Sequence, residues 1–100
     1  FQGGSNFQGS VSDAQFILQR ANLGETEYGG IREYIWDMWL KLESIGDNAI
    51  NHPRQVLAAI CHIEAIDAGL KARPSLIMKR FNIGRSYQGW IQYCRCISSK

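Results

Sequence analysis

Residues that could carry catalysis are few and poorly arranged for it. Cys61 and His62 are neighbours in the chain, and adjacent residues of a helix do not converge, so they do not form a nucleophile with its base. Glu64 and Asp67 lie one helical turn apart and could share a proton, but an ion pair between Asp67 and Lys71 explains that spacing more simply. No glycine-rich phosphate loop is present. We therefore expect neither an enzyme nor a cofactor or small-molecule substrate.

The cysteines indicate reduced thiols rather than a disulfide framework or a metal site. There are three, Cys61, Cys94 and Cys96, an odd number without regular spacing. On a helix, Cys94 and Cys96 would point about 200° apart and would not share a zinc ion. This favours a cytoplasmic or nuclear protein that binds no metal.

The charges are distributed unevenly along the chain. Residues 1–67 contain all nine acidic residues and four bases, a charge of −5. Residues 68–100 contain seven bases and no acid, a charge of +7. A field of one sign attracts polyanions, so nucleic acid is the first expected partner. An acidic protein surface, or the acidic half of the same molecule, is the alternative.

Apolar residues recur at helical spacing in five segments, and no segment alternates as a strand would. A Ser12–Gln15 capping box opens the first predicted helix and Gly24 ends it. The other predicted helices cover residues 30–45, 53–68, 74–81 and 86–97. Residues 53–68 are apolar in nearly every direction, which is typical of a central helix. No apolar run reaches the roughly 18 residues that a membrane-spanning helix needs.

These elements predict an all-α fold, a compact bundle of about five helices around the helix at residues 53–68. Residues 11–100 form a single helical domain in this interpretation. Phe1–Ser5 resembles the remnant of a cleaved tag, and we expect residues 1–10 to be a disordered lead-in.

The last two predicted helices have the size of a helix-turn-helix pair. Ile77, Phe81, Ile83 and Ile91 fall where such a unit places apolar contacts, whereas Gln88 falls where an apolar residue is usual. In such a unit the exposed residues of the second helix read base edges, and flanking bases hold phosphates. The predicted nucleic-acid contacts, DNA being the first expectation, are Lys71, Arg73, Lys79, Arg80, Arg85, Gln88, Gln92 and Arg95. A plain pair of packing helices with solubilising bases is the alternative.

The helix at residues 30–45 carries more apolar side chains than one face needs. Trp36, Trp39 and Leu40 widen its stripe beyond half the circumference. Either its own domain surrounds this helix, or the three residues form an interface with a protein partner or a second copy. The second possibility predicts a protein-interaction domain, of viral or phage origin, as the alternative function.

The order of these segments resembles one repeat of the cyclin fold, in the version found in transcription factor IIB and its archaeal counterparts. The resemblance covers about residues 30–97. The matching segments are Leu57–Ala65, Gly69, Arg73–Leu76 and Phe81–Ile83. Family repeats usually place the proline before the basic residue, whereas Arg73 precedes Pro74 here, and the family carries two repeats and a zinc ribbon. The resemblance implies a five-helix bundle in a transcription assembly, touching DNA or polymerase through its last two helices.

Overall fold

The computed structural model describes residues 13–98, which form five α-helices joined by turns and short 3-10 segments. No strand occurs within these residues. The first helix covers residues 13–21. The elements that follow are η1 (Leu23–Glu25), η2 (Gly29–Ile31), α2 (Arg32–Ser44), η3 (Asn48–Asn51), α3 (Pro53–Asp67), α4 (Pro74–Phe81), η4 (Arg85–Trp90) and α5 (Ile91–Ser98). The predicted all-α bundle of about five helices is therefore confirmed. The capping residue Ser12 and the predicted lead-in at 1–10 lie outside the described residues.

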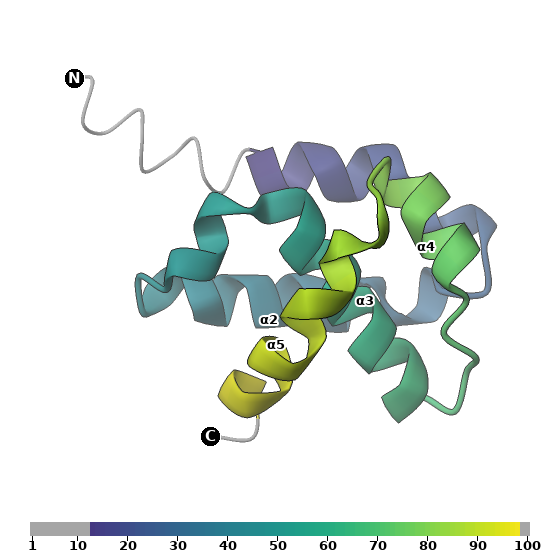
Figure 1. Ribbon diagram of the computed structural model, residues 1–100. Helices are drawn as coiled ribbons and strands as arrows, with labels where there is room; N and C mark the ends of the chain where they lie inside the picture. The colour runs from purple at the N-terminus through teal and green to yellow at the C-terminus, as the bar shows by residue number, and fades with distance from the viewer. Residues whose placement is uncertain (1–12, 99–100) are drawn as a thin grey trace.

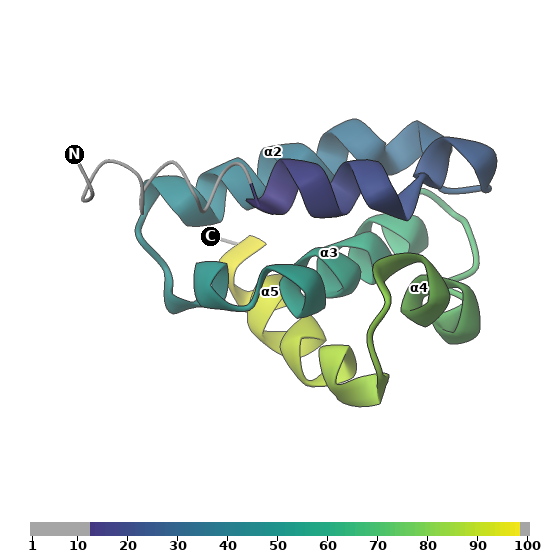
Figure 2. The same ribbon diagram turned by 90° about the horizontal axis from the view of Figure 1, so that it is seen from above.

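The helices are arranged in layers around α3 (Figures 1 and 2). The first helix and α2 run antiparallel on one side of α3, while α4, η4 and α5 lie on its other side. In agreement with this arrangement, α3 packs against α2, α4, η4 and α5. The helices that precede α3 and those that follow it therefore lie on opposite sides of this one helix.

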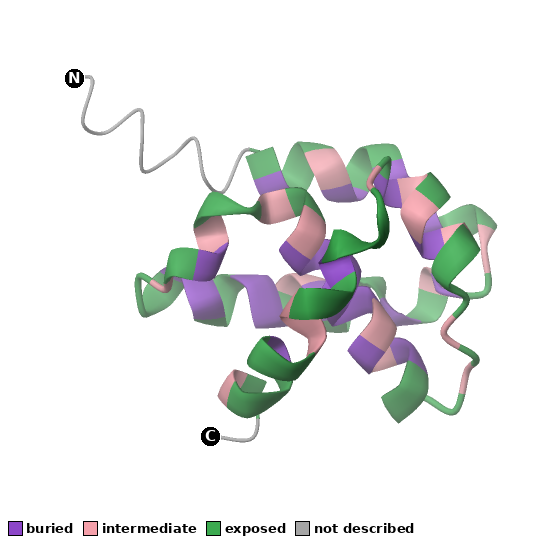
Figure 3. Ribbon diagram, in the orientation of Figure 1, coloured by how far each residue is buried: buried purple, intermediate pink, exposed green. Residues whose placement is uncertain are grey.

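The position of α3 follows from its composition. Residues 56–61 are six consecutive buried residues, and Ile63 and Ala65 are buried after them. A helix with apolar side chains on every face can bury them only when other elements pack against every face. The small alanine side chains of α3 let those elements approach closely. Buried residues accordingly concentrate along α3 and on the faces turned towards it (Figure 3). The prediction of a central helix is confirmed.

Three helix ends after the first helix use a residue in the left-handed conformation. Gly46, Gly69 and Asn82 have φ angles of 66°, 80° and 55°. After Gly69, the Leu70 N–H donates to the Ala65 carbonyl at 2.8 Å, which completes a Schellman motif at the end of α3. The end of the first helix differs from the prediction. It lies at residue 21 because Asn22, at φ 52°, takes the left-handed position that was assigned to Gly24.

Two other segments differ from the sequence-based prediction. The segment predicted as one helix over 86–97 begins with the 3-10 segment η4, whose N-cap residue is Gly84. A 3-10 turn places residues three apart directly above one another, so Tyr87 is buried and Trp90 packs against the core from the same face. The predicted loop after α2 contains η3, whose first turn is capped by the Asp47 carboxylate accepting from Ala49 N–H at 2.8 Å.

Candidate nucleic-acid interface

The last turn of α4 presents two bases to the first helix and α3. Pro74 begins α4 with its φ already set for a helix, and Ile77 and Phe81 are buried. Lys79 and Arg80 occupy positions between these anchors, where Lys79 is exposed and Arg80 is half-buried. The apolar anchors thus fix where the two positive charges lie.

A pocket of about 390 Å³ lies beside these bases and is lined by residues of the first helix, α3 and α4. Four of its lining residues are cationic and none is acidic. The bases are Arg20, Arg54, Lys79 and Arg80. We call this the basic pocket. Four like charges around one concave surface produce a focused positive potential, which raises the local concentration of anions.

Arg80 has an unused donor at this site. Its Nε atom is buried and has no hydrogen-bond partner among the described residues. Buried polar atoms are nearly always paired in folded proteins, so an unpaired guanidinium N–H beside a pocket indicates a site for an acceptor. Arg20 is positioned differently, with its guanidinium carbon 5.4 Å from the centre of the Phe16 ring, a cation–π distance.

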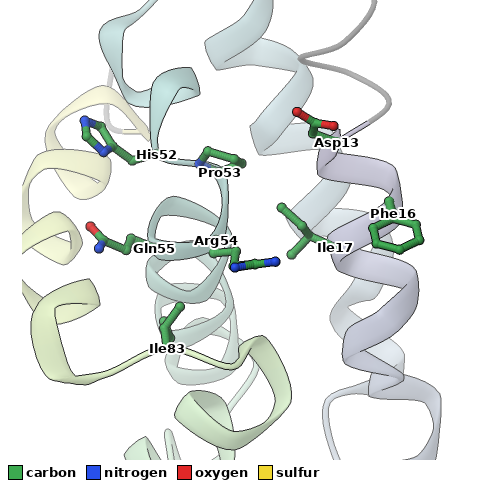
Figure 4. A pocket seen from close by; sticks show the side chains of 8 residues that line it. All are labelled: Asp13, Phe16, Ile17, His52, Pro53, Arg54, Gln55 and Ile83. Atoms are coloured by element: carbon green, nitrogen blue, oxygen red, sulfur yellow. The ribbon is translucent and has the colours of Figure 1, made fainter.

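A second pocket of about 560 Å³ adjoins the basic pocket (Figure 4). Phe16, Ile17 and Arg54 line both, and the Arg54 side chain points from α3 towards Ile17 on the first helix. We call this the adjoining pocket. Its remaining lining residues are Asp13, His52, Pro53, Gln55 and Ile83. The two pockets therefore lie side by side, one with a basic lining and the other with a mixed apolar and polar lining.

The wall of the adjoining pocket is held by η4. The Trp90 ring lies 5.0 Å from the His52 ring between centroids, and Trp90 Nε1–H donates to Gln55 Oε1 at 2.9 Å. Gln55 is thereby oriented, and its amide N–H groups remain as donors. Trp90 also packs edge-on against Tyr93 at 5.4 Å. The segment that follows α4 thus supports the beginning of α3, where the pocket lies.

The remaining predicted nucleic-acid contacts lie elsewhere. Arg73 Nε is 3.1 Å from a Glu27 carboxylate oxygen, so a carboxylate of the acidic half already neutralises it. Lys71 lies in the same connection between α3 and α4. Four others are exposed beyond α4: Arg85 and Gln88 on η4, and Gln92 and Arg95 on α5. The structure therefore brings two of the eight predicted residues together at the basic pocket.

Arg20 and Arg54 were missed by the sequence analysis. Both belong to the acidic part of the chain, and charge counted over long segments conceals single bases that the fold moves next to others. Arg54 did carry a signal, because it occupies the first turn of α3, where the positive end of the helix dipole disfavours a cation.

The structure changes the predicted aromatic interface. Trp39 has an exposure of 0% and belongs to the core, so its assignment as an interface residue was wrong. Its neighbours on the same helix differ: Trp36 is half-buried and Leu40 is 40% exposed. The excess of apolar residues on α2 is therefore explained mainly by burial within the domain.

Further features of the described residues bear on catalysis, metal binding and membrane insertion. Burial raises the pKa of the Cys61 thiol to about 12, which leaves no thiolate nucleophile at neutral pH. Within residues 13–98, no three histidine, cysteine or acidic side chains gather as metal ligands. In the same range, no helix combines the length and the apolar character required to cross a bilayer.

Comparison of the chain with protein-family models, curated proteins and solved structures gives no match. The resemblance to a cyclin-fold repeat accordingly stays a prediction.

Proposed function

We propose that this chain is a nucleic-acid-binding helical module of a regulatory or transcription-related protein. The observation that carries the proposal is the basic pocket, where Arg20, Arg54, Lys79 and Arg80 come from three helices and no lining residue is acidic. The phosphate backbone supplies most of the affinity of such proteins, through lysine and arginine contacts that release condensed counterions.

The arrangement suits phosphate oxygens in particular. Arginine presents a planar fork of N–H donors that matches phosphate, and charge-assisted hydrogen bonds of this kind are about twice as strong as neutral ones. Arg80 lines this pocket, and its Nε–H has no hydrogen-bond partner among the described residues. Arg85 is exposed at the start of η4, outside the basic pocket. Base reading by Gln88, Gln92 and Arg95 remains a prediction of the helix-turn-helix interpretation.

The test is binding of a labelled DNA duplex measured at several salt concentrations. Four phosphate contacts give a slope of about −3.6 for log affinity against log salt. Arg54→Gln removes one contact and reduces the magnitude of that slope by about 0.9. Arg73→Gln is the matched control, because Arg73 is already paired with Glu27. Absence of binding at low salt, or an affinity independent of salt, would contradict the proposal.

A second candidate function is protein interaction through α2. The observation that favours it is the pair of partly uncovered apolar residues Trp36 and Leu40, one helical turn apart. Sedimentation velocity over a range of concentrations, with the wild type and Leu40→Glu, tests whether this face of α2 is an interface between copies of the chain. Association that Leu40→Glu abolishes supports an interface, whereas a monomer at every concentration excludes self-association.

A further inference from the structure

We propose that the two pockets together hold one unpaired nucleotide of a nucleic-acid strand, with its phosphate in the basic pocket and its base in the adjoining pocket. This inference rests on the proposed nucleic-acid function and specifies which form of nucleic acid the site accepts. The observations that carry it are the shared walls of the two pockets and the contrast between their linings.

The geometry joins an anion site to an apolar surface. Phe16, Ile17 and Arg54 line both pockets, so the anion site and the apolar surface lie next to each other. A nucleotide has the same two parts, a phosphate and a flat ring system, on one small framework. Inorganic phosphate would use only the basic end and would leave the larger pocket unoccupied.

The adjoining pocket has the surfaces that a nucleobase uses. The Phe16 ring is 56% exposed, and Ile17 and Ile83 are half-buried beside it, which offers faces for stacking and apolar contact. The His52 ring and the Gln55 amide provide hydrogen-bonding groups at the same wall. Asp13 is the single acidic residue lining this pocket, and it is absent from the lining of the basic pocket. It disfavours a phosphate here and can accept from a base amino group.

The pocket discriminates against a paired duplex. Within a duplex each base is stacked and paired, so it enters a pocket only after extrusion, which costs several kcal/mol. A single strand presents its bases without that cost. The four cations of the basic pocket therefore contribute to the binding of a duplex and of a single strand alike, but only the single strand also fills the adjoining pocket.

The experiment compares fluorescence anisotropy of a short single-stranded oligonucleotide and a blunt duplex, at one salt concentration, with wild type and Phe16→Ala. We expect the wild type to bind the single strand about tenfold more tightly than the duplex. Phe16→Ala should weaken single-strand binding about tenfold and duplex binding much less, because only the single strand loses a stacked base while both lose the support of Arg20. Tyr34→Ala, which removes another exposed aromatic ring from α2, is the matched control. Circular dichroism establishes that each variant is folded.

Because Phe16 also supports Arg20, a second measurement is needed. NMR titration with a nucleoside monophosphate should shift the methyl signals of Ile17 and Ile83, whereas inorganic phosphate should shift only signals at the basic pocket. Equal binding of both strands, or methyl signals that the nucleotide leaves unchanged, would overturn the nucleotide site while leaving nucleic-acid binding intact. If neither polymer binds, the proposed function fails as well. Binding of the monophosphate alone would indicate a free nucleotide and overturn the strand proposal.

Discussion

At the scale of single residues, Tyr28 links two parts of the chain that are far apart in sequence. Its hydroxyl donates to the Lys71 carbonyl at 2.7 Å and accepts from the Arg73 N–H at 2.8 Å. The side chain has an exposure of 0%. One phenol therefore forms hydrogen bonds with both a carbonyl and an N–H of the connection between α3 and α4. These two bonds help to fix the start of α4, and with it the positions of the basic residues on that helix.

Tyr28→Phe tests this role. The variant keeps the ring but leaves the Lys71 carbonyl and the Arg73 N–H without their partner. We expect the free energy of unfolding to fall by about 2 kcal/mol. Urea denaturation measures it, with Tyr34→Phe on the exposed side of α2 as the control, which should change stability by less than about 0.5 kcal/mol. A Tyr28→Phe variant as stable as the wild type would show that the two hydrogen bonds contribute nothing.

His62 gives a second prediction at this scale. Burial, and then the positive charge of Arg95, lower the pKa of its imidazole below the ordinary 6.5. Its Nδ1 is buried without a partner among the described residues, and the Tyr87 ring of η4 lies 6.4 Å away between centroids. The folded state thus disfavours the protonated form, so stability is present above pH 6.5 and is lost as the pH falls through the lower, folded-state pKa.

The urea midpoint of the wild type should therefore fall between pH 7.5 and 5.5, and that fall should be smaller in His62→Gln. Glu64 on the same helix acts in the opposite direction, because burial and Asp67 raise its pKa above 4.5. Comparing the two proteins at both pH values removes the Glu64 contribution. An unchanged pH dependence in His62→Gln would contradict the assignment.

At the scale of elements, the position of the α4 bases depends on how α3 ends. Gly69 has a φ of 80° and reverses the chain, so that Leu70 N–H reaches the Ala65 carbonyl. The connection then continues to Pro74, which begins α4. A glycine is required at position 69 because a Cβ there would be strained by the positive φ even though space around it is open.

Gly69→Ala should lower the free energy of unfolding by about 1 kcal/mol, the cost of a left-handed residue with a Cβ. Gly84→Ala is the matched control: a Cβ there also meets open space, and its φ of −94° is accessible to alanine. Guanidinium titration of both variants measures the difference. The interpretation fails if the two substitutions have the same effect.

At the scale of the whole molecule, α3 connects the remaining elements. It packs against α2 on one side and against α4, η4 and α5 on the other. The basic pocket likewise depends on α3, since Arg54 lies between the bases of the first helix and those of α4. A helix shared by all layers should make unfolding a single cooperative transition.

Ile60→Ala should destabilise the protein by about 2–5 kcal/mol, because Ile60 is buried at the centre of α3 and its removal leaves a cavity. Ile66→Ala, on the exposed side of the same helix, should cost less than about 1 kcal/mol. Thermal unfolding followed by circular dichroism and by tryptophan fluorescence gives both values. Transitions that differ between the two probes would show that the layers unfold separately.

Local patterns determined the helices. The apolar residues of 53–68 predicted the central helix, and the apolar spacing over 74–81 predicted α4, because each signal acts within a few residues. The same patterns were less informative where two backbone conformations of a segment have similar free energy. Asn22 replaced Gly24 at a left-handed position, and η4 replaced the first turns of the last predicted helix.

Only the tertiary structure decided which side chains meet. Trp39 became core and Leu40 surface although they are neighbours, because their difference depends on what packs against α2. The sequence alone determined that positive charge gathers late in the chain. It did not determine that Arg20 and Arg54 join Lys79 and Arg80, since contacts between distant residues depend on the packing of whole helices around α3 rather than on spacing along the chain.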